Sequence, residues 1–121
     1  MSNEVKTPEN ESAVTTPTEL QKLYLRPAAD VYRDEHAVRI LLDVPGADEG
    51  SLNVSVHDGT LSIQAEVLRS DTEQRVYERA FQVDRRMDTS QIEATLQHGV
   101  LQLRIPFHEE ARPRRIEVKS A

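Results

Sequence analysis

Apolar residues alternate with polar ones in a series of short runs, and each run stops at residues typical of turns. The clearest run places Val38, Ile40, Leu42 and Val44 at every second position before Pro45-Gly46. Side chains point alternately to the two faces of a β-strand, so a period of two gives each strand one apolar face. A long helix cannot satisfy this period. The chain is therefore restricted to a fold made of short strands.

Two pairs of runs flank tight turns at Asp58-Gly59 and His98-Gly99. Two-residue turns of this kind close β-hairpins, and their central residues take a positive φ, which we also expect of His98. The apolar residues before the two turns are Leu52, Val54 and Val56, and Ile92, Ala94 and Leu96. After the turns the alternation resumes at residues 61–67 and 101–105.

A weaker run at residues 30–33 and one at residues 76–83 bring the expectation to about seven strands with no long helix, which is typical of an antiparallel β-sandwich. In the run at 76–83, Tyr77, Arg79 and Phe81 share one face. We therefore predict an all-β antiparallel β-sandwich in which one strand face contains an arginine.

The sequence divides into three parts. Residues 1–26 are predicted to be a disordered acidic leader, except that Leu20, Leu23 and Tyr24 stand at helical spacing behind Thr18 and predict a short amphipathic turn or helix. The domain is expected at residues 27–107. Residues 108–121 are polar and proline-containing, and we expect a flexible C-terminal tail.

Composition excludes several classes of function. The chain has no cysteine, so disulfides and thiol chemistry are ruled out, and a reducing compartment is compatible with it. A net charge of −6 argues against a nucleic-acid partner. No run is long enough to cross a membrane, and the first residues lack the pattern of a signal peptide. We predict a soluble cytoplasmic protein.

Catalytic and cofactor motifs are also absent from the sequence. The four histidines lack the spacing of metal ligands, and the four glycines fall at turns without forming a phosphate-binding loop. There is no nucleophile elbow. The sequence therefore predicts a protein that is not an enzyme and uses no metal or cofactor.

An ordered set of short motifs runs through the predicted domain. The pieces are Asp30-Val31-Tyr32, Leu42-Asp43-Val44-Pro45-Gly46, Asp58-Gly59-Thr60-Leu61-Ser62-Ile63, Ala94 to Leu101 with Gly99-Val100-Leu101, and Ile105-Pro106. Together they resemble the alpha-crystallin domain of the small heat-shock protein family. The resemblance covers residues 27–107 and extends to Ile116-Glu117-Val118, which is similar to the I-x-I/V anchoring motif of that family.

The resemblance implies an all-β, immunoglobulin-like antiparallel β-sandwich, a dimeric building block, assembly through the tails and ATP-independent capture of unfolding client proteins. Two features depart from the family pattern. The segment between Ile63 and Phe81 is shorter than the usual strand-exchanging loop, which leaves the route to a dimer open. Val83-Asp84 replaces the usual Leu-Pro, and the leader is short, so we expect small oligomers.

By resemblance, Ile116 and Val118 are expected to anchor the tail in a groove of a neighbouring subunit. The groove is predicted to lie between the strand with Leu52, Val54 and Val56 and the strand with Ile92, Ala94 and Leu96. The same residues could instead be ordinary core, and the tail could be a frayed end or an intramolecular strand.

Two further sites follow from the same reasoning. Arg79 matches the arginine on the dimer-forming strand of the family, and a partner across an interface is expected for it, with a solvated edge arginine as the alternative. Leu20, Leu23 and Tyr24 are expected to bind clients or other subunits, or else to fold back over their own domain.

Three functions are consistent with the sequence. The first is a holdase, an ATP-independent chaperone that binds partly unfolded proteins and prevents their aggregation under stress. The second is a CS-type co-chaperone adaptor, which shares the sandwich but docks on a folded chaperone; the basic tail ending in Ile-Glu-Val favours self-assembly instead. The third is a structural partner subunit of a longer small heat-shock protein.

Overall fold

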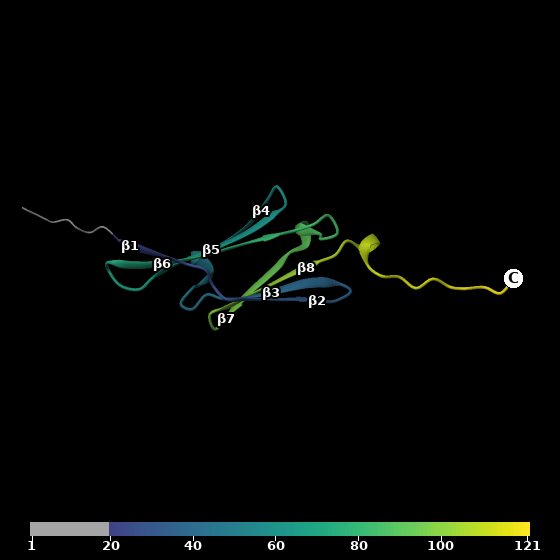
Figure 1. Ribbon diagram of the computed structural model, residues 1–121. Helices are drawn as coiled ribbons and strands as arrows, with labels where there is room; N and C mark the ends of the chain where they lie inside the picture. The colour runs from purple at the N-terminus through teal and green to yellow at the C-terminus, as the bar shows by residue number, and fades with distance from the viewer. Residues whose placement is uncertain (1–19) are drawn as a thin grey trace, which may run out of the picture.

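A computed structural model describes residues 20–121, which form two stacked sheets of four strands each (Figure 1). The first sheet has the order β1-β6-β5-β4 and the second the order β2-β3-β8-β7. The strands of the first sheet are β1 (Gln21–Leu25), β4 (Leu52–His57), β5 (Thr60–Leu68) and β6 (Glu73–Gln82). Those of the second are β2 (Ala29–Arg33), β3 (Ala37–Asp43), β7 (Glu93–Gln97) and β8 (Val100–Pro106).

The predicted all-β sandwich with mainly antiparallel sheets is confirmed. Every named strand pair is antiparallel except β1 and β6, which run parallel. The helical pieces of residues 20–121 are three single 3₁₀ turns, at Glu49–Ser51, Thr89–Gln91 and Glu109–Ala111. No helix in this described part could cross a membrane.

The interpretation of the segment around Leu20 to Tyr24 as a helical turn is wrong. Residues Gln21–Leu25 form β1, whose first N–H donates to the Thr72 carbonyl oxygen at 2.8 Å. A helix this short satisfies few of its own backbone groups, whereas the exposed edge of β6 offers a full row of partners. Long-range pairing therefore overrides the local spacing of the apolar residues.

Buried aliphatic side chains from β3, β5 and β8 fill the space between the sheets. Leu42, Leu61 and Leu103 are fully buried, and the buried residues of the described part include no charged side chain. Fully burying such a side chain stabilises the fold by about 1.5–3 kcal/mol. The alternation seen in the sequence corresponds directly to these inward-facing positions.

The two tight hairpins fix which residues face inward. Asp58 and Gly59 have φ of 51° and 76°, and His98 and Gly99 have φ of 52° and 75°, as type I′ turns require. The positive φ expected of His98 is confirmed. A change of one residue in either register would turn every apolar side chain of that strand outward, so the turns specify the core.

Substituting Gly99 should test the contribution of the second hairpin to stability. A Cβ at this position would meet the Cα of Pro45 at 3.2 Å in addition to the strain of the positive φ. We expect Gly99→Ala to lower the free energy of unfolding by about 1–3 kcal/mol, measured by urea denaturation. Gly50→Ala is the control, because its Cβ would come no closer than 3.6 Å to another atom, the Asp48 Oδ1. Equal stability of the two variants would contradict the assignment.

Candidate functional site

The edge strands β4 and β7 come from different sheets, and a hollow of about 370 Å³ lies between them. Five of its seven lining residues are apolar, and Glu49 adds one carboxylate. The lining residues are Glu49, Leu52, Val54, Ala94, Thr95, Leu96 and Leu101. Both strands are the last in their sheets, so each also has a row of backbone groups without a strand partner among residues 20–121.

Four of the six residues predicted for the groove are brought together here, namely Leu52, Val54, Ala94 and Leu96. Val56 and Ile92 do not line the hollow. Val56 is 38% exposed near the hairpin turn, and Ile92 packs against the core. The alternative that these residues are ordinary core explains their contacts but not their exposure. Leu52, Val54 and Leu96 pack on the core, yet their side chains remain half-exposed.

Sequence reasoning missed Leu101, Thr95 and Glu49. Leu101 lies directly opposite Leu96 across the β7–β8 hairpin. The His98-Gly99 turn was enough to infer that pairing, so the signal for Leu101 was present. No pattern in the sequence pointed to Glu49, which belongs to a 3₁₀ turn whose N-cap, Asp48, accepts a hydrogen bond from the Ser51 N–H at 3.0 Å.

The backbone of β4 gives the hollow a directional edge. A two-residue hairpin makes His57 and Thr60 the pair that closes the turn, so the N–H and C=O groups of Val54 and Val56 point away from β5. The side chain of Val54 faces the hollow at the same time. An extended peptide can therefore pair with this edge while its own apolar side chains enter the hollow.

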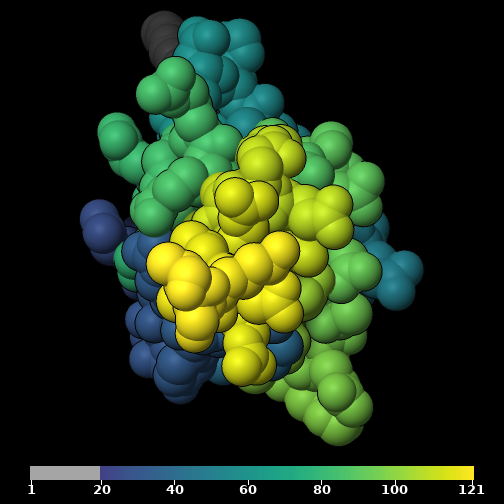
Figure 2. Space-filling view, turned by 90° about the vertical axis from the view of Figure 1, so that its right-hand side faces the viewer, coloured from purple at the N-terminus to yellow at the C-terminus, as the bar shows by residue number. Residues whose placement is uncertain are grey.

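The tail motif does not occupy this hollow in its own chain. Ile116 and Val118 are 75% and 90% exposed, and residues 112–121 form no strand. In Figure 2 the C-terminal residues lie on the outside of the sandwich, at the front of the face shown. The side chains that would anchor the tail are therefore accessible to another molecule.

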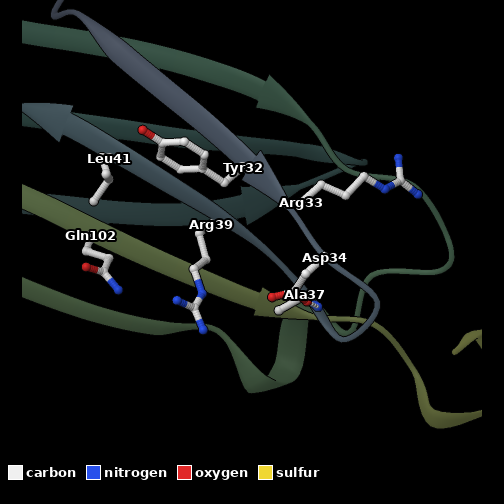
Figure 3. A pocket seen from close by; sticks show the side chains of 7 residues that line it. All are labelled: Tyr32, Arg33, Asp34, Ala37, Arg39, Leu41 and Gln102. Atoms are coloured by element: carbon white, nitrogen blue, oxygen red, sulfur yellow. Dashed lines mark hydrogen bonds between the residues drawn. The ribbon is translucent and has the colours of Figure 1, made fainter.

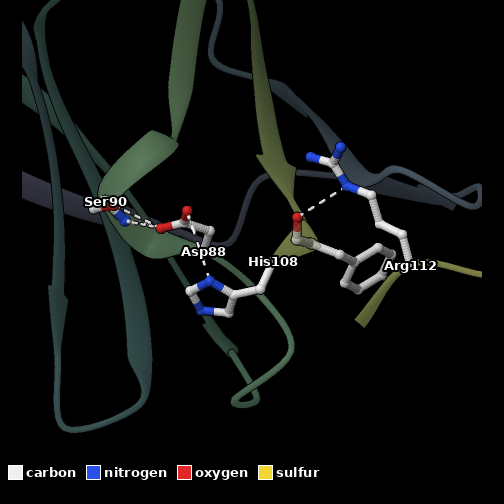
Figure 4. A network of polar contacts seen from close by, with 5 residues as sticks. Asp88, Ser90, His108 and Arg112 are labelled. Atoms are coloured by element: carbon white, nitrogen blue, oxygen red, sulfur yellow. Dashed lines mark hydrogen bonds and ion pairs between the residues drawn. The ribbon is translucent and has the colours of Figure 1, made fainter. Parts of the chain in front are cut away.

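A polar network lies where the tail leaves the sandwich (Figure 4). The Ser90 hydroxyl donates to the Asp88 carboxylate at 2.6 Å, and this bond holds the pKa of Asp88 below its ordinary value. His108 Nδ1 lies 3.7 Å from the same carboxylate, and Arg112 Nε donates to the Phe107 carbonyl oxygen at 3.2 Å. These contacts fix the starting direction of the tail but involve neither Ile116 nor Val118.

Arg79 lies on the inner face of β6 and contacts its own chain. Its Nη1 donates to the Pro27 carbonyl oxygen at 2.9 Å, and its guanidinium carbon lies 5.0 Å from the centre of the Phe81 ring. The Nε is buried without a hydrogen-bond partner. The side chain is half-buried, so it is not a solvated edge arginine. A partner across an interface stays a prediction.

The predicted client-binding residues lie on or beside β1. Leu20, Leu23 and Tyr24 are 39%, 47% and 60% exposed, so they do not fold back into the core. Tyr24 and Leu23 project to opposite faces of the sheet, because they are adjacent residues of one strand. The structure therefore presents them as an exposed strip and not as one pocket.

Ionisable groups form no candidate metal centre within residues 20–121. His57 and Asp58 lie 3.3 Å apart, but both side chains are almost fully exposed at a turn. The pKa of Asp34 is lowered by hydrogen bonds from the backbone N–H groups of His36 and Ala37, which stabilise the turn between β2 and β3. These carboxylates support turns.

Comparison with protein families gives one match, which covers most of the chain. The model of the Hsp20/alpha crystallin family matches residues 30–119, a span that includes the sandwich from β2 onward and the Ile-Glu-Val motif.

Several curated proteins are similar over most of their length. The 18 kDa antigen 2 of Mycobacterium avium is 36% identical over 107 residues, which cover 77% of this chain and 76% of that protein. A probable 15 kDa heat shock protein of Leptospira interrogans is 28% identical, and the alignment covers 99% of both chains. An 18 kDa heat shock protein of Streptomyces albus is 30% identical, with 77% and 75% coverage.

Solved structures share the fold. A small heat-shock protein from Xylella fastidiosa is 27% identical and superposes with a TM-score of 0.62, covering 79% of this chain and 98% of the other. Heat shock protein 16.0 of Schizosaccharomyces pombe has a TM-score of 0.63 at 23% identity, with 78% and 99% coverage, which supports the fold alone.

The Arg79 contact predicts a local effect on the connection between β1 and β2. Arg79→Ala should remove a hydrogen bond from a charged donor and lower the free energy of unfolding by about 1.5 kcal/mol, and it should also speed amide exchange at residues 25–29. Arg85→Ala is the control, since Arg85 is exposed. Denaturation together with hydrogen exchange measures both effects. If the two variants behave alike, the contact does not stabilise this connection.

Proposed function

The chain belongs to the Hsp20/alpha crystallin family, the small heat-shock proteins, and from this premise we propose that it is an ATP-independent holdase. Family membership supports a chaperone-type role in the stress response. The observation that carries the finer proposal is the half-exposed apolar hollow between β4 and β7, beside a free backbone edge. Such a surface can hold an extended apolar segment of an unfolding protein and requires no nucleotide.

We propose that Ile116 and Val118 occupy the same hollow in a neighbouring copy. The two β-branched side chains stand one residue apart, so in an extended chain both point to one side, where the hollow presents Leu52, Val54 and Leu96. Tail and client then compete for one surface. Release of the tail exposes the hollow to clients.

The charges around the tail motif suit the same site. Arg114, Arg115 and Lys119 flank the motif, and Glu49 is the carboxylate that lines the hollow. An exposed pair of this kind adds little affinity but favours one orientation of the bound strand. The basic tail also distinguishes this chain from an adaptor of the CS type, which typically carries an acidic tail.

Self-association is part of the proposal. The solved relative from Xylella fastidiosa is described as having a distinct high order structure, and we propose a dimer or small oligomer for this chain. Leu20, Leu23 and Tyr24 supply an additional exposed apolar strip for clients or subunits. We further propose a cytoplasmic protein that is not an enzyme and needs no cofactor.

Holdase activity predicts stoichiometric protection without nucleotide. A heat-labile enzyme warmed with increasing amounts of the protein should show less light scattering in proportion to the molar ratio, because each bound segment is removed from aggregation. Added ATP should change nothing. Unchanged aggregation at every ratio, combined with binding to a folded chaperone, would favour the adaptor; protection only in the presence of a longer small heat-shock protein would favour the partner-subunit alternative.

The tail and the hollow should bind each other directly. A labelled peptide of residues 112–121, added to the chain that ends at Pro113, should bind measurably by fluorescence anisotropy. Ala94→Glu should weaken this binding at least about tenfold, because a charged side chain fills the hollow where two aliphatic side chains would otherwise be buried. The double substitution of Ile116 and Val118 by Ala in the peptide should have a similar effect.

Gln97→Glu is the matched control, since Gln97 is exposed on β7 and does not line the hollow. It adds the same charge to the same strand. If Gln97→Glu weakens binding of the peptide as much as Ala94→Glu does, the tail is bound by its charge and not by insertion into the hollow.

A further inference from the structure

Strand β2 is an edge of the second sheet, and no other strand of residues 20–121 lies on its outer side. Its pairing with β3 identifies the free backbone groups. The Asp43 N–H donates to the Ala28 carbonyl oxygen at 3.1 Å, and the Asp34 N–H donates to the Ala37 carbonyl oxygen at 3.0 Å. Hydrogen-bonded pairs alternate along an antiparallel ladder, so Asp30 and Tyr32 also bond to β3. The N–H and C=O groups of Ala29, Val31 and Arg33 therefore point outward.

The side chains of this edge are open to solvent as well. Val31 and Tyr32 are each 55% exposed, although Val31 has the parity of the inner face. Natural edge strands are commonly protected by lysine, proline, a bulge or an inward-pointing charge. Lysine, proline and bulges do not occur within Ala29–Arg33, which pairs with β3 in an unbroken register. The charge with inner-face parity, Arg33, is exposed at the last position of the strand, 5.3 Å from the centre of the Phe107 ring, and leaves the edge at Val31 uncovered. The edge is therefore available to another strand.

Two requirements restrict how a second copy of β2 could pair with this edge. A closed two-fold dimer keeps the inner faces of both copies on the same side, so odd-numbered residues of β2 must lie opposite odd-numbered ones and even opposite even. Hydrogen bonding imposes the same condition, because only the odd-numbered residues carry outward N–H and C=O groups, and these must face each other. The pairing must therefore be centred on a residue and not between two residues.

Charge selects one register among those that remain. Centring the pair on Asp30 places two aspartates opposite each other, and centring it on Tyr32 places Asp30 opposite Asp34. Centring it on Arg33 opposes two arginines. Like charges directly opposite are destabilising. Centring it on Ala29 makes no like-charge pair, but it requires Arg33 to lie opposite Leu25, which belongs to β1 of the other sheet. Centring it on Val31 avoids all of these contacts and pairs the whole of β2.

We propose that two copies of this chain associate through β2, antiparallel and centred on Val31, so that their second sheets join into one continuous sheet. Val31 then lies opposite Val31, Ala29 opposite Arg33, and Asp30 opposite Tyr32. The Val31–Val31 pair and the two Ala29–Arg33 pairs each exchange two backbone hydrogen bonds between the copies. The proposal rests on the self-association included in the proposed function and names the surface that performs it.

The outer face beside β2 fits this arrangement. A hollow of about 270 Å³ lies there, with Tyr32 and Arg39 among its lining residues (Figure 3). Tyr32 lies opposite Arg39 on β3, and within residues 20–121 no carboxylate comes within ion-pair distance of Arg39. In the proposed dimer, Asp30 of the second copy lies opposite Tyr32, which itself lies opposite Arg39, so the three side chains are cross-strand neighbours on the outer face. The carboxylate of that Asp30 is thereby brought to the rim of this hollow.

A single cysteine gives a direct test, because the chain has none of its own. Opposed residues of a hydrogen-bonded pair have Cα atoms about 5.5 Å apart, within the range of a disulfide. Val31→Cys should therefore give mostly cross-linked dimer under mild oxidation at low protein concentration. Val56→Cys is the matched control, an exposed valine on the edge of the other sheet, and should stay mainly uncross-linked. Equal cross-linking of the two variants would overturn the proposal.

A second variant removes the free donor without a cross-link. Val31→Pro deletes an outward N–H and keeps the ladder to β3, as proline at a strand edge does. We expect at least about a tenfold weaker dimer by analytical ultracentrifugation, with an unchanged far-ultraviolet spectrum. In the chain that ends at Pro113, where no tail motif is left to pair with β4, Val56→Pro should leave the dimer intact. A folded Val31→Pro variant that dimerises as tightly as the unmodified protein would contradict the assignment.

The outcomes separate this surface from the proposed function. Protection of a heat-labile enzyme by a protein whose Val31→Cys variant does not cross-link supports the holdase and removes the β2 dimer. Efficient cross-linking at Val31 in a protein that never reduces light scattering supports the dimer and removes the holdase.

Discussion

The molecule depends on a single constraint, which is that neither sheet closes on itself. In the part of the chain that the structure describes, stacking two four-stranded sheets buries the aliphatic face of each but leaves an edge strand, paired on one side alone, at both ends of both sheets. The burial that stabilises the sandwich and the exposure of backbone edges are therefore consequences of the same architecture. A barrel of the same strands would have the core without the edges, and it would have nothing to offer an extended peptide.

The part of the fold set by local rules could be predicted from the sequence. Period-two alternation identified the strands around Ile40, Ile63 and Leu103, and the two hairpin turns fixed the registers of the last two with their hairpin partners. In both cases the information lies within a few residues of the element it specifies. The family resemblance then supplied the sandwich topology, which alternation alone does not determine, because any strand order can bury an alternating face.

What could not be predicted depends on contacts between residues far apart in the chain. The spacing of Leu20, Leu23 and Tyr24 suits a helix, yet β6 offers its edge to this segment and the strand forms. The carbonyl that binds Arg79 belongs to Pro27, which is distant in sequence and without a distinctive pattern. Four groove residues were found because they alternate in predicted strands, while Glu49 was missed because it lies in a connecting turn.

Under the proposed function, such an edge can exchange its occupants because the energies of binding one tail motif nearly cancel. Burying an isoleucine and a valine contributes about 1.5–3 kcal/mol each, whereas ordering the backbone of a three-residue motif costs about 1–2 kcal/mol per residue. In that proposal the Ile-Glu-Val motif remains bound mainly because its attachment to an assembled neighbour raises its effective concentration. Heating then increases the entropic term for the tail, and an unfolding client would offer longer apolar segments to the same hollow. Weak individual binding is thus a requirement for exchange, and a tighter tail would leave the hollow closed to clients.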